Sequence, residues 1–308
     1  MSIVGSGVPT NRSNIQLPNE VSSEILQKTQ EASMIMRLAR QIPLPGRGVQ
    51  IPVILGDPSA AWVAETGSKP VSNPTLDKKI MVGNKLAVIV PFSMEFRRDA
   101  ASLYDALISR LPAALGKKFD ETVFFGPPVG TSLSNFDDFH SIAGTSLQSS
   151  VYGGLVNADA VISAAGGIMN GIVLAPQGKS MLLGALDTTN RPIFIDTVRD
   201  GDVPRVLGAP TYVTGAAYQA GATGDKTDPA VPDIVGVAGD WSKALWGTVE
   251  GVQISYSEDA VLTYLSGTEV VTVNLFQQNM FAVRAEIEVG FVAQTDYFTY
   301  LTRTHAGE

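Results

Sequence analysis

The chain has 308 residues, 44% of them hydrophobic, which is enough for one or two domains with a substantial core. Its charged share of 17% is low for a free monomer, and its net charge of −8 argues against tight nucleic-acid binding, which needs a basic stripe to displace counterions. The chain contains no cysteine, so disulfide frameworks and thiolate metal sites are excluded.

The N-terminal part predicts a draped arm followed by a helix. Residues 1–17 are rich in glycine, serine, asparagine and proline, and they lack the basic region and apolar core of a signal peptide. Apolar residues recur at helical spacing from Val21 to Ala39, and Pro43 and Pro45 end this helix. No apolar run reaches the ~18 residues of a membrane span, so we expect a soluble protein outside the usual export route, with no membrane contact.

The stretch from Ala60 to Asp99 predicts a long two-stranded arm with a polar tip. Its turn-rich polar part contains Trp62, Glu65, Lys69 and Pro70. The apolar β-type run Leu86–Val90 follows and is closed by Pro91. Because an isolated hairpin of that length is marginal in water, we expect the arm to lie on another copy of the same chain.

A long helix is predicted from Ser102 to Phe125. Its apolar residues recur every four positions and form one stripe, at Leu103, Leu107, Leu111, Leu115, Phe119 and Val123. Pro112 should kink the helix, because proline removes a backbone hydrogen bond and crowds the preceding turn. Gly126 and two following prolines end it.

The middle of the chain alternates short helices with apolar strands, which indicates a compact α/β-like subdomain. The predicted helices are Ala158–Ala165 and Ser180–Leu186. The predicted strands are Gly171–Ala175, Pro192–Asp196, Pro210–Val213, Ile234–Val237, Leu245–Val249 and Val252–Tyr256, and a tip loop spans Gly221–Asp233. From Glu269 to Val292 the chain is again rich in β-forming residues, and we expect this segment to pack beside the long helix.

The side chains that could carry chemistry form no catalytic or metal-binding pattern, so we expect no enzyme activity and no cofactor. We interpret His140 and His305 as exposed, because neither has the spacing of a metal-ligand motif. We interpret Asp137–Asp138 and Glu258–Asp259 as solvent or turn residues. The tryptophans fit either a buried core position or a subunit contact, where aromatic residues are enriched; they are Trp62, Trp241 and Trp246.

An ordered set of segments resembles the major capsid proteins of tailed bacteriophages with the Hong Kong 97 phage capsid fold. The segments are the arm helix, A-W-V-A-E-T-G-S-K-P at 61–70, K-L-A-V-I-V-P-F-S-M-E at 85–95, the long helix ending in F-F-G at 126, the α/β middle, G-D-W-S-K-A-L-W-G at 239–247 and N-M-F-A-V-R-A-E at 279–286. The resemblance covers about residues 19–301. No single segment is decisive, but their order is specific.

The resemblance implies an α+β fold with four named parts. These are an N-terminal arm at 1–46, an extended hairpin called the E-loop at 47–93, a peripheral (P) domain at 94–154 with return strands at 262–308, and an axial (A) domain at 155–261. The long helix would be the spine of the P-domain, and the loop Gly221–Asp233 would lie near a five- or six-fold axis. Trp62, Glu65, Lys69 and Pro70 would lie in the E-loop and serve assembly.

The resemblance also implies a function. The chain would be a structural subunit that self-assembles as pentamers and hexamers into the icosahedral head around the phage double-stranded DNA. Its partners would be other copies of itself, a portal, and separate scaffolding, protease or decoration proteins, with weak non-specific contact to DNA. The location would be the virion, after assembly in the cytoplasm of the bacterial host.

Two alternatives stay open at this point. Some family members carry a helical scaffolding segment before the arm, whereas Met1 here lies only a few residues before it, so we expect scaffolding to be separate or absent. Encapsulin-type nanocompartment shell proteins share the fold and lack that segment, and they are the first alternative. A soluble α+β hydrolase is the second, since fold alone does not settle function.

The resemblance further implies a candidate covalent crosslink. In the Hong Kong 97 phage capsid, an E-loop lysine forms an isopeptide bond with an asparagine of a neighbouring subunit, helped by a glutamate. The matching positions here are Lys69, Asn279 and Glu286. A lysine attacks an amide only as the neutral amine, so the site would need a desolvated pocket and a base. The alternative is a solvated loop lysine and two strand residues with structural hydrogen bonds or ion pairs.

Overall fold

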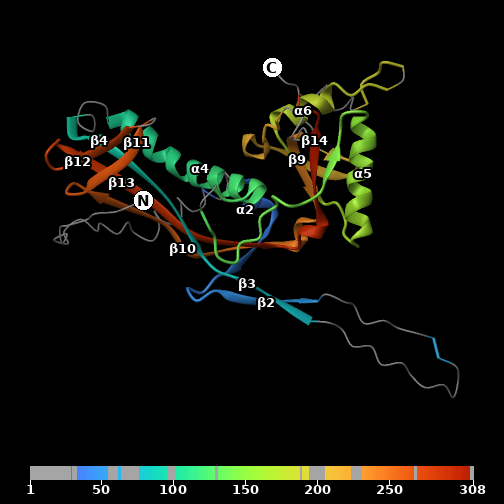
Figure 1. Ribbon diagram of the computed structural model, residues 1–308, viewed down its shortest axis with the longest axis horizontal. Helices are drawn as coiled ribbons and strands as arrows, with labels where there is room; N and C mark the ends of the chain where they lie inside the picture. The colour runs from blue at the N-terminus through green and yellow to red at the C-terminus, as the bar shows by residue number, and fades with distance from the viewer. Residues whose placement is uncertain are drawn as a thin grey trace.

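The computed structural model describes residue 29 and residues 33–54, 62–63, 76–95, 101–128, 131–187, 189–193, 205–222, 231–266 and 269–305. Within these ranges the chain has an α+β fold built on a four-stranded and a six-stranded sheet, with two separate two-stranded hairpins (Figure 1). The helices are α2 (Met34–Leu38), α4 (Ala101–Phe125), α5 (Val151–Ala164) and α6 (Pro176–Leu183), with 3₁₀ turns η1 (Gly215–Ala217), η2 (Trp241–Lys243) and η3 (Thr295–Tyr297).

The four-stranded sheet has the order β1-β10-β13-β4 and is covered on one face by α4. Its strands are β1 (Arg40–Pro43), β10 (Ala244–Ser257), β13 (Met280–Ala293) and β4 (Asn84–Ser93). Alternate residues of β13 from Val283 to Val289 are buried, while Arg284 between them is exposed, as expected for a strand with one covered face. Phe119 of α4 meets Phe291 of β13 edge to face at 6.3 Å, which confirms that the late β segment packs beside the long helix.

The prediction of the long helix is confirmed. α4 spans Ala101–Phe125 and contains Pro112. Among its described side chains the stripe of every fourth residue is buried, at Leu111, Leu115, Phe119 and Val123. The apolar residues at every fourth position therefore form a packed face, and packing of such a face is the usual origin of helix stability in proteins.

The six-stranded sheet has the order β5-β14-β9-β6-β8-β7. Its strands are β5 (Gly144–Ser146), β14 (Phe298–Arg303), β9 (Asp233–Gly239), β6 (Gly171–Leu174), β8 (Ala209–Val213) and β7 (Arg205–Val206). Helices α5 and α6 share a core with one face of this sheet through Leu155, Leu182 and Leu301. The opposite face, through Val173 and Val237, belongs to the same core as α4, so the two sheets are joined by continuous apolar packing.

The predicted two-stranded arm exists but is shorter than predicted. β2 (Val49–Ile54) pairs with β3 (Leu76–Met81) and projects from the body (Figure 1). The run Leu86–Val90, which we placed in the arm and in the E-loop at 47–93, instead lies in β4 and pairs with β13. The chain changes partner at Gly83, where a Cβ atom would stand 2.7 Å from the Glu288 side chain, so a larger residue would require the Glu288 and Val249 side chains to shift.

Three further strands do not lie in the sheet that we expected from the predicted A-domain and P-domain ranges. β10 lies in the four-stranded sheet although its residues fall within the predicted A-domain at 155–261. β14 pairs with β9 in the six-stranded sheet although we expected return strands of the P-domain at 262–308. β5 also pairs with β14, although it falls within 94–154. In each case the pairing joins segments far apart in the chain, which local patterning does not report.

Several element boundaries also differ. α5 begins at Val151 rather than Ala158, because Ser150 caps it by accepting from the Gly153 N–H, and α6 begins at Pro176 rather than Ser180. β10 is one strand where two were predicted, because register shifts between Thr248 and Gln253 absorb the irregular residues. Of the predicted strand Pro192–Asp196, Pro192 makes a single bridge and residues 194–196 lie outside the described range.

The N-terminal helix is described only at its end. Ser33 caps α2 by accepting from the Met36 N–H, and β1 follows directly. We did not predict β1, which is a short parallel strand beside β10. The remainder of the predicted helix from Val21, and the arm at residues 1–17, lie outside the described residues, apart from the helical Thr29.

A second hairpin closes the far end of the four-stranded sheet. It consists of β11 (Val261–Ser266) and β12 (Glu269–Asn274), paired antiparallel. Its inner face forms a small core through Val273, Leu275 and Ala282. Glu258 and Asp259 lie exposed in the bend before it, as predicted.

Candidate assembly surfaces

The base of the projecting hairpin is fixed to the body by a buried contact and an ion pair. Met81 packs with Leu44 and Val292 in a small core of its own. Lys79 of β3 donates to Asp137 Oδ2 at 2.7 Å and to the Ala293 carbonyl at 2.7 Å. Asp137 is therefore not the simple solvent residue that we predicted, since it also accepts from the Ala293 N–H at 3.3 Å. The hairpin leaves the body in a defined direction.

The predicted assembly residues lie beyond this base. Trp62 is fully exposed, at 105% of its reference area, so its own chain does not cover it. Glu65, Lys69 and Pro70 lie outside the described residues. The open choice for the other two tryptophans is settled: Trp241 and Trp246 are buried in the core, and Trp241 Nε1 donates to the Gly171 carbonyl at 3.1 Å.

Two of the candidate crosslink residues, Asn279 and Glu286, are described, whereas Lys69 lies outside the described residues. Asn279 is exposed in the turn before β13, with a φ of 52°, and its carbonyl accepts from the Met94 N–H at 3.1 Å. Glu286 lies in the middle of β13, and its Oε2 is 3.4 Å from Arg284 Nε. At ~3.3 Å per strand residue Asn279 and Glu286 stand roughly 20 Å apart, so within one chain this glutamate is not placed to assist a bond at this asparagine.

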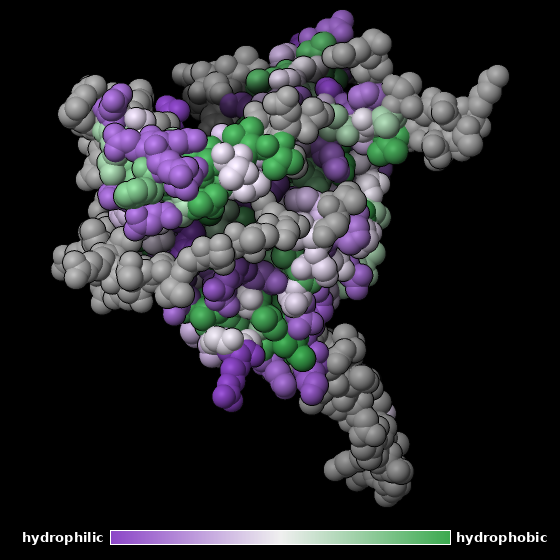
Figure 2. All heavy atoms as spheres, turned by 60° about the vertical axis from the view of Figure 1, so that its left-hand side comes forward, coloured by the Kyte–Doolittle hydropathy of each residue, from purple (hydrophilic) through white to green (hydrophobic). Residues whose placement is uncertain are grey.

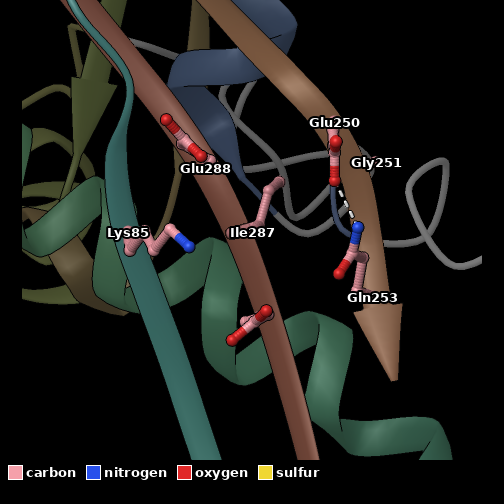
Figure 3. A pocket seen from close by; sticks show the side chains of 7 residues that line it. Lys85, Glu250, Gly251, Gln253, Ile287 and Glu288 are labelled. Carbon is pink, nitrogen blue, oxygen red and sulfur yellow. Dashed lines mark hydrogen bonds between the residues drawn. The ribbon is translucent and has the colours of Figure 1, made fainter. Parts of the chain in front are cut away.

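The exposed face of the four-stranded sheet carries a shallow acidic groove (Figure 3). It is lined by Lys85, Glu250, Gly251, Gln253, Glu286, Ile287 and Glu288. Gln253 donates to Glu250 beside the irregular part of β10. The described residues contain no group of three or more histidine, aspartate or glutamate side chains placed to hold a metal ion, and the groove is a polar sheet surface.

A buried carboxylate joins the N-terminal segment to α4. Asp120 is fully buried, and its oxygens accept from Ser33 Oγ at 2.5 Å, from the Met34 N–H at 2.8 Å and from the Ile35 N–H at 3.3 Å. Burial raises the pKa of Asp120 to about 7, although these three donors act in the opposite direction. Asp120 thus binds the first turn of α2, a role that we did not predict.

A second buried carboxylate holds the base of the predicted tip loop. Asp233 accepts from the Gly221 N–H at 2.8 Å, from Arg303 Nε at 2.8 Å and contacts His305 Nδ1 at 2.6 Å. Burial alone would raise its pKa, but these hydrogen bonds outweigh that effect and hold the pKa at about 2. His305 is therefore not the exposed residue that we predicted, whereas His140 is exposed and contacts Asp138. Residues 223–230 of the loop lie outside the described range.

Large apolar side chains remain exposed at many described positions outside the arm, including Ile168, Leu186 and Val231, and three further places carry such side chains. On α5 they are Tyr152, Val156 and Val161; at the turn between β7 and β8 it is Leu207; and on the β11–β12 end they are Val261, Val270 and Phe276. Figure 2 brings the end with β11 and β12 forward and shows apolar side chains at the surface between polar ones. Exposed apolar groups gathered on whole elements are typical of surfaces that contact partners.

The described helices include none that is both long and apolar enough to cross a membrane. The described residues thus form two large cores, two small cores and a projecting hairpin.

Comparison with known proteins gives these surfaces a context. The chain is 27% identical over 307 residues to the "Probable major capsid protein gp17" of Mycobacterium phage L5, covering 95% of this chain and 90% of the relative. It is 24% identical to the "Major capsid protein" of Staphylococcus phage 80alpha, covering 89% of this chain and 80% of the relative.

Solved structures show the same fold. The chain from Gordonia phage Cozz matches with a TM-score of 0.69 at 21% identity, covering 90% of this chain and 87% of that chain. The chain from Microbacterium phage Oxtober96 matches with a TM-score of 0.66 at 25% identity, and the match covers 88% of this chain and 91% of that chain. These likenesses confirm the predicted Hong Kong 97 capsid fold. The family model described as "Phage capsid family" matches residues 14–302, nearly the whole chain, and the chain belongs to the phage capsid family.

Proposed function

We propose that this chain is the major capsid protein of a tailed phage, a structural subunit that self-assembles as pentamers and hexamers into the icosahedral head around double-stranded DNA. The names of its relatives and its membership of the capsid family support this assignment. The carrying observation is the hairpin β2–β3, which is fixed at its base by Lys79 and projects without a second layer from the described part of the chain. A hairpin of this kind gains stability only on another surface.

The domain division that goes with this proposal follows the pairing of strands. The E-loop would be the hairpin at 49–81, the P-domain would consist of 84–139 and 244–293, and the A-domain would consist of 144–239 and 298–303. The segment before residue 47 would be the N-terminal arm. The two crossings between the sheets, at η2 and η3, would form the joint between P-domain and A-domain.

The partners follow from the same proposal. The chief partner would be the chain itself, with a portal and separate scaffolding, protease or decoration proteins as further ones. Contact with packaged DNA would be weak, because a net charge of −8 makes the average field repulsive to phosphate. The protein would reside in the virion after assembly in the host cytoplasm.

The test is the size and content of the particles that the purified full-length chain forms. We expect sedimentation at the size of a closed shell, and electron micrographs with icosahedral outlines. Particles recovered from infected cells should contain nuclease-protected double-stranded DNA. A chain that stays monomeric or forms only small oligomers in all conditions would contradict a shell subunit. Shells that enclose a cargo protein instead of DNA would favour an encapsulin-type compartment.

A further inference from the structure

One exposed flank of α5 is apolar and carries the only charge of the helix. Leu155, Ala158 and Ile162 face the six-stranded sheet and are fully buried. Tyr152 and Val156 are neighbours four residues apart on one flank of the helix, and they are 49% and 40% exposed. Asp159 is the only charged residue of the helix, and it has no ion pair in the described part of the chain.

The turn between β7 and β8 also exposes an apolar side chain, and the charge beside it is positive. Leu207 is 42% exposed and has a φ of 50°, followed by Gly208 at 83°. The left-handed region strains a leucine, because its Cβ crowds the following carbonyl, and glycine or asparagine is usual there. Strained residues of this kind persist where function holds them. Arg205 is exposed two residues before it, is the only charged residue of this hairpin, and forms no ion pair with the described residues.

These two surfaces stand at opposite edges of one sheet. β7 is one edge strand of the six-stranded sheet and β5 is the other. α5 lies against the β5 edge so closely that a Cβ on Gly154 would stand 2.5 Å from the Ser146 carbonyl. With strands ~4.8 Å apart, the two edges are roughly 24 Å from one another, so the surfaces do not meet within a chain. Copies placed edge to edge, head to tail, bring them together.

The spacing and the charges of the two surfaces match. Val156 and Asp159 are three residues apart on a helix and so are neighbours at ~5–6 Å. Arg205 and Leu207 are two residues apart near the end of a strand, ~6–7 Å. One apolar group and one charge on each side can therefore pair at the same time, leucine on valine and arginine on aspartate. A two-fold contact of either surface with its own copy would instead place like charges together.

We propose that Arg205 and Leu207 of one copy dock on Asp159 and the Tyr152–Val156 face of α5 of the next copy, and that this head-to-tail contact closes the ring of each capsomer. The inference rests on the proposed shell function and adds the residues that join neighbours. Tyr152 and Val156 receive the leucine side chain, and Asp159 fixes the register through Arg205. The strain at Leu207 keeps its side chain extended from the turn.

The chain has no cysteine, so engineered cysteines report contacts between copies without background. The test variant is Val156→Cys with Leu207→Cys in the full-length chain, assembled into particles and treated with a short bis-maleimide linker. We expect a denaturing gel with a ladder that ends at five and six subunits. Each single variant should stay monomeric on the gel, because in a head-to-tail contact a residue does not meet its own copy. Leu207→Cys with Val261→Cys, which replaces Val156 by an exposed valine of the β11–β12 hairpin, is the matched control and should give no ladder.

Charge reversal tests the register separately. Asp159→Arg and Arg205→Asp should each lower the yield of particles at least 10-fold, and the double reversal should restore it to within about 2-fold. Intact particles that show no ladder for the double-cysteine variant, or a covalent dimer for a single-cysteine variant, would overturn this contact while leaving the shell function standing. Failure of the unsubstituted chain to form particles of any kind would overturn the proposed function instead. If the cysteine variants do not fold, the charge reversals alone decide: equal losses in the single and double variants would refute the pairing.

Discussion

Replacing Asp120 by asparagine should remove most of the pH dependence of subunit stability between about pH 4 and pH 7. Asp120 is buried between α4 and the first turn of α2, where it accepts from Ser33 and two backbone N–H groups. Burial raises its pKa from 3.8 to about 7. Between these two values the folded chain holds a proton that the unfolded chain has released, so stability falls as the pH rises.

The size of the effect follows from the two pKa values. A difference of roughly three pKa units at ~1.4 kcal/mol each gives about 4 kcal/mol. This contribution is present in full below pH 4 and is lost by about pH 7, above which both states are ionised. Asp120→Asn cannot titrate, yet its carbonyl oxygen can still accept from Ser33. The difference in unfolding free energy between the two proteins should therefore change by about 4 kcal/mol from pH 4 to pH 8, with the aspartate favoured at low pH.

Urea unfolding of the unassembled subunit, followed by circular dichroism at several pH values, measures this difference directly. The two histidines are common to both proteins, so their titration cancels. Glu121→Gln is the matched control: it alters the next residue of α4, whose side chain is 35% exposed, and should shift the difference by less than ~1 kcal/mol. A difference that stays constant over this range, or that favours the aspartate at high pH, would refute the reasoning.

Four further outcomes follow from the contacts described. Lys79→Ala should leave one cooperative unfolding transition and cost only ~1–2 kcal/mol, but it should lower the yield of complete shells seen by electron microscopy, since it releases the hairpin base. Asp233→Asn should abolish the loss of stability as the pH falls from about 4 to 2, read by thermal melting in acid, because the low pKa of this carboxylate stabilises the fold only while it is ionised. If the crosslink operates, boiled mature particles should give a ladder that disappears in Lys69→Ala, and a single band near 32.6 kDa would exclude the bond. Leu207→Asn should raise subunit stability by ~0.5–1 kcal/mol in urea unfolding while it weakens assembly; lower stability would argue against strain at this turn.

The sequence predicted those parts of the fold whose signal is local. The α4 stripe repeats over the whole helix, and every described member of it is buried. The order of segments was also sufficient for the capsid fold. The arm was half right because β4 alternates between half-buried and exposed residues, a pattern that fits an arm strand and a sheet edge equally well. Only the partner distinguishes the two, and that partner, β13, lies almost 200 residues further along the chain.

The functional contacts were harder to predict than the elements. Asp120 follows directly after Phe119 on the buried side of α4. A buried carboxylate needs hydrogen-bond donors around it. Nothing nearby in the sequence identifies these donors as the groups at the start of α2. Lys79 and Asp137 are 58 residues apart, and each alone resembles an ordinary surface charge. Lys69, Glu65 and Pro70 fall outside the described residues, so their assembly role stays a prediction.

The described surface explains how a subunit of this kind can remain folded alone and still favour a shell. The main core extends from the four-stranded sheet through α4 to the six-stranded sheet, so the body does not depend on neighbours. The features that are unfavourable in a single copy lie outside that core: a fully exposed Trp62, a strained Leu207 and an apolar flank on α5. In the proposed shell, contact with a neighbour would bury Trp62 and the apolar flank of α5, and it would compensate for the strain at Leu207. Because every copy in a closed ring makes the same contacts, these small gains repeat at each interface, and a shell becomes stable as a whole although no single contact is strong.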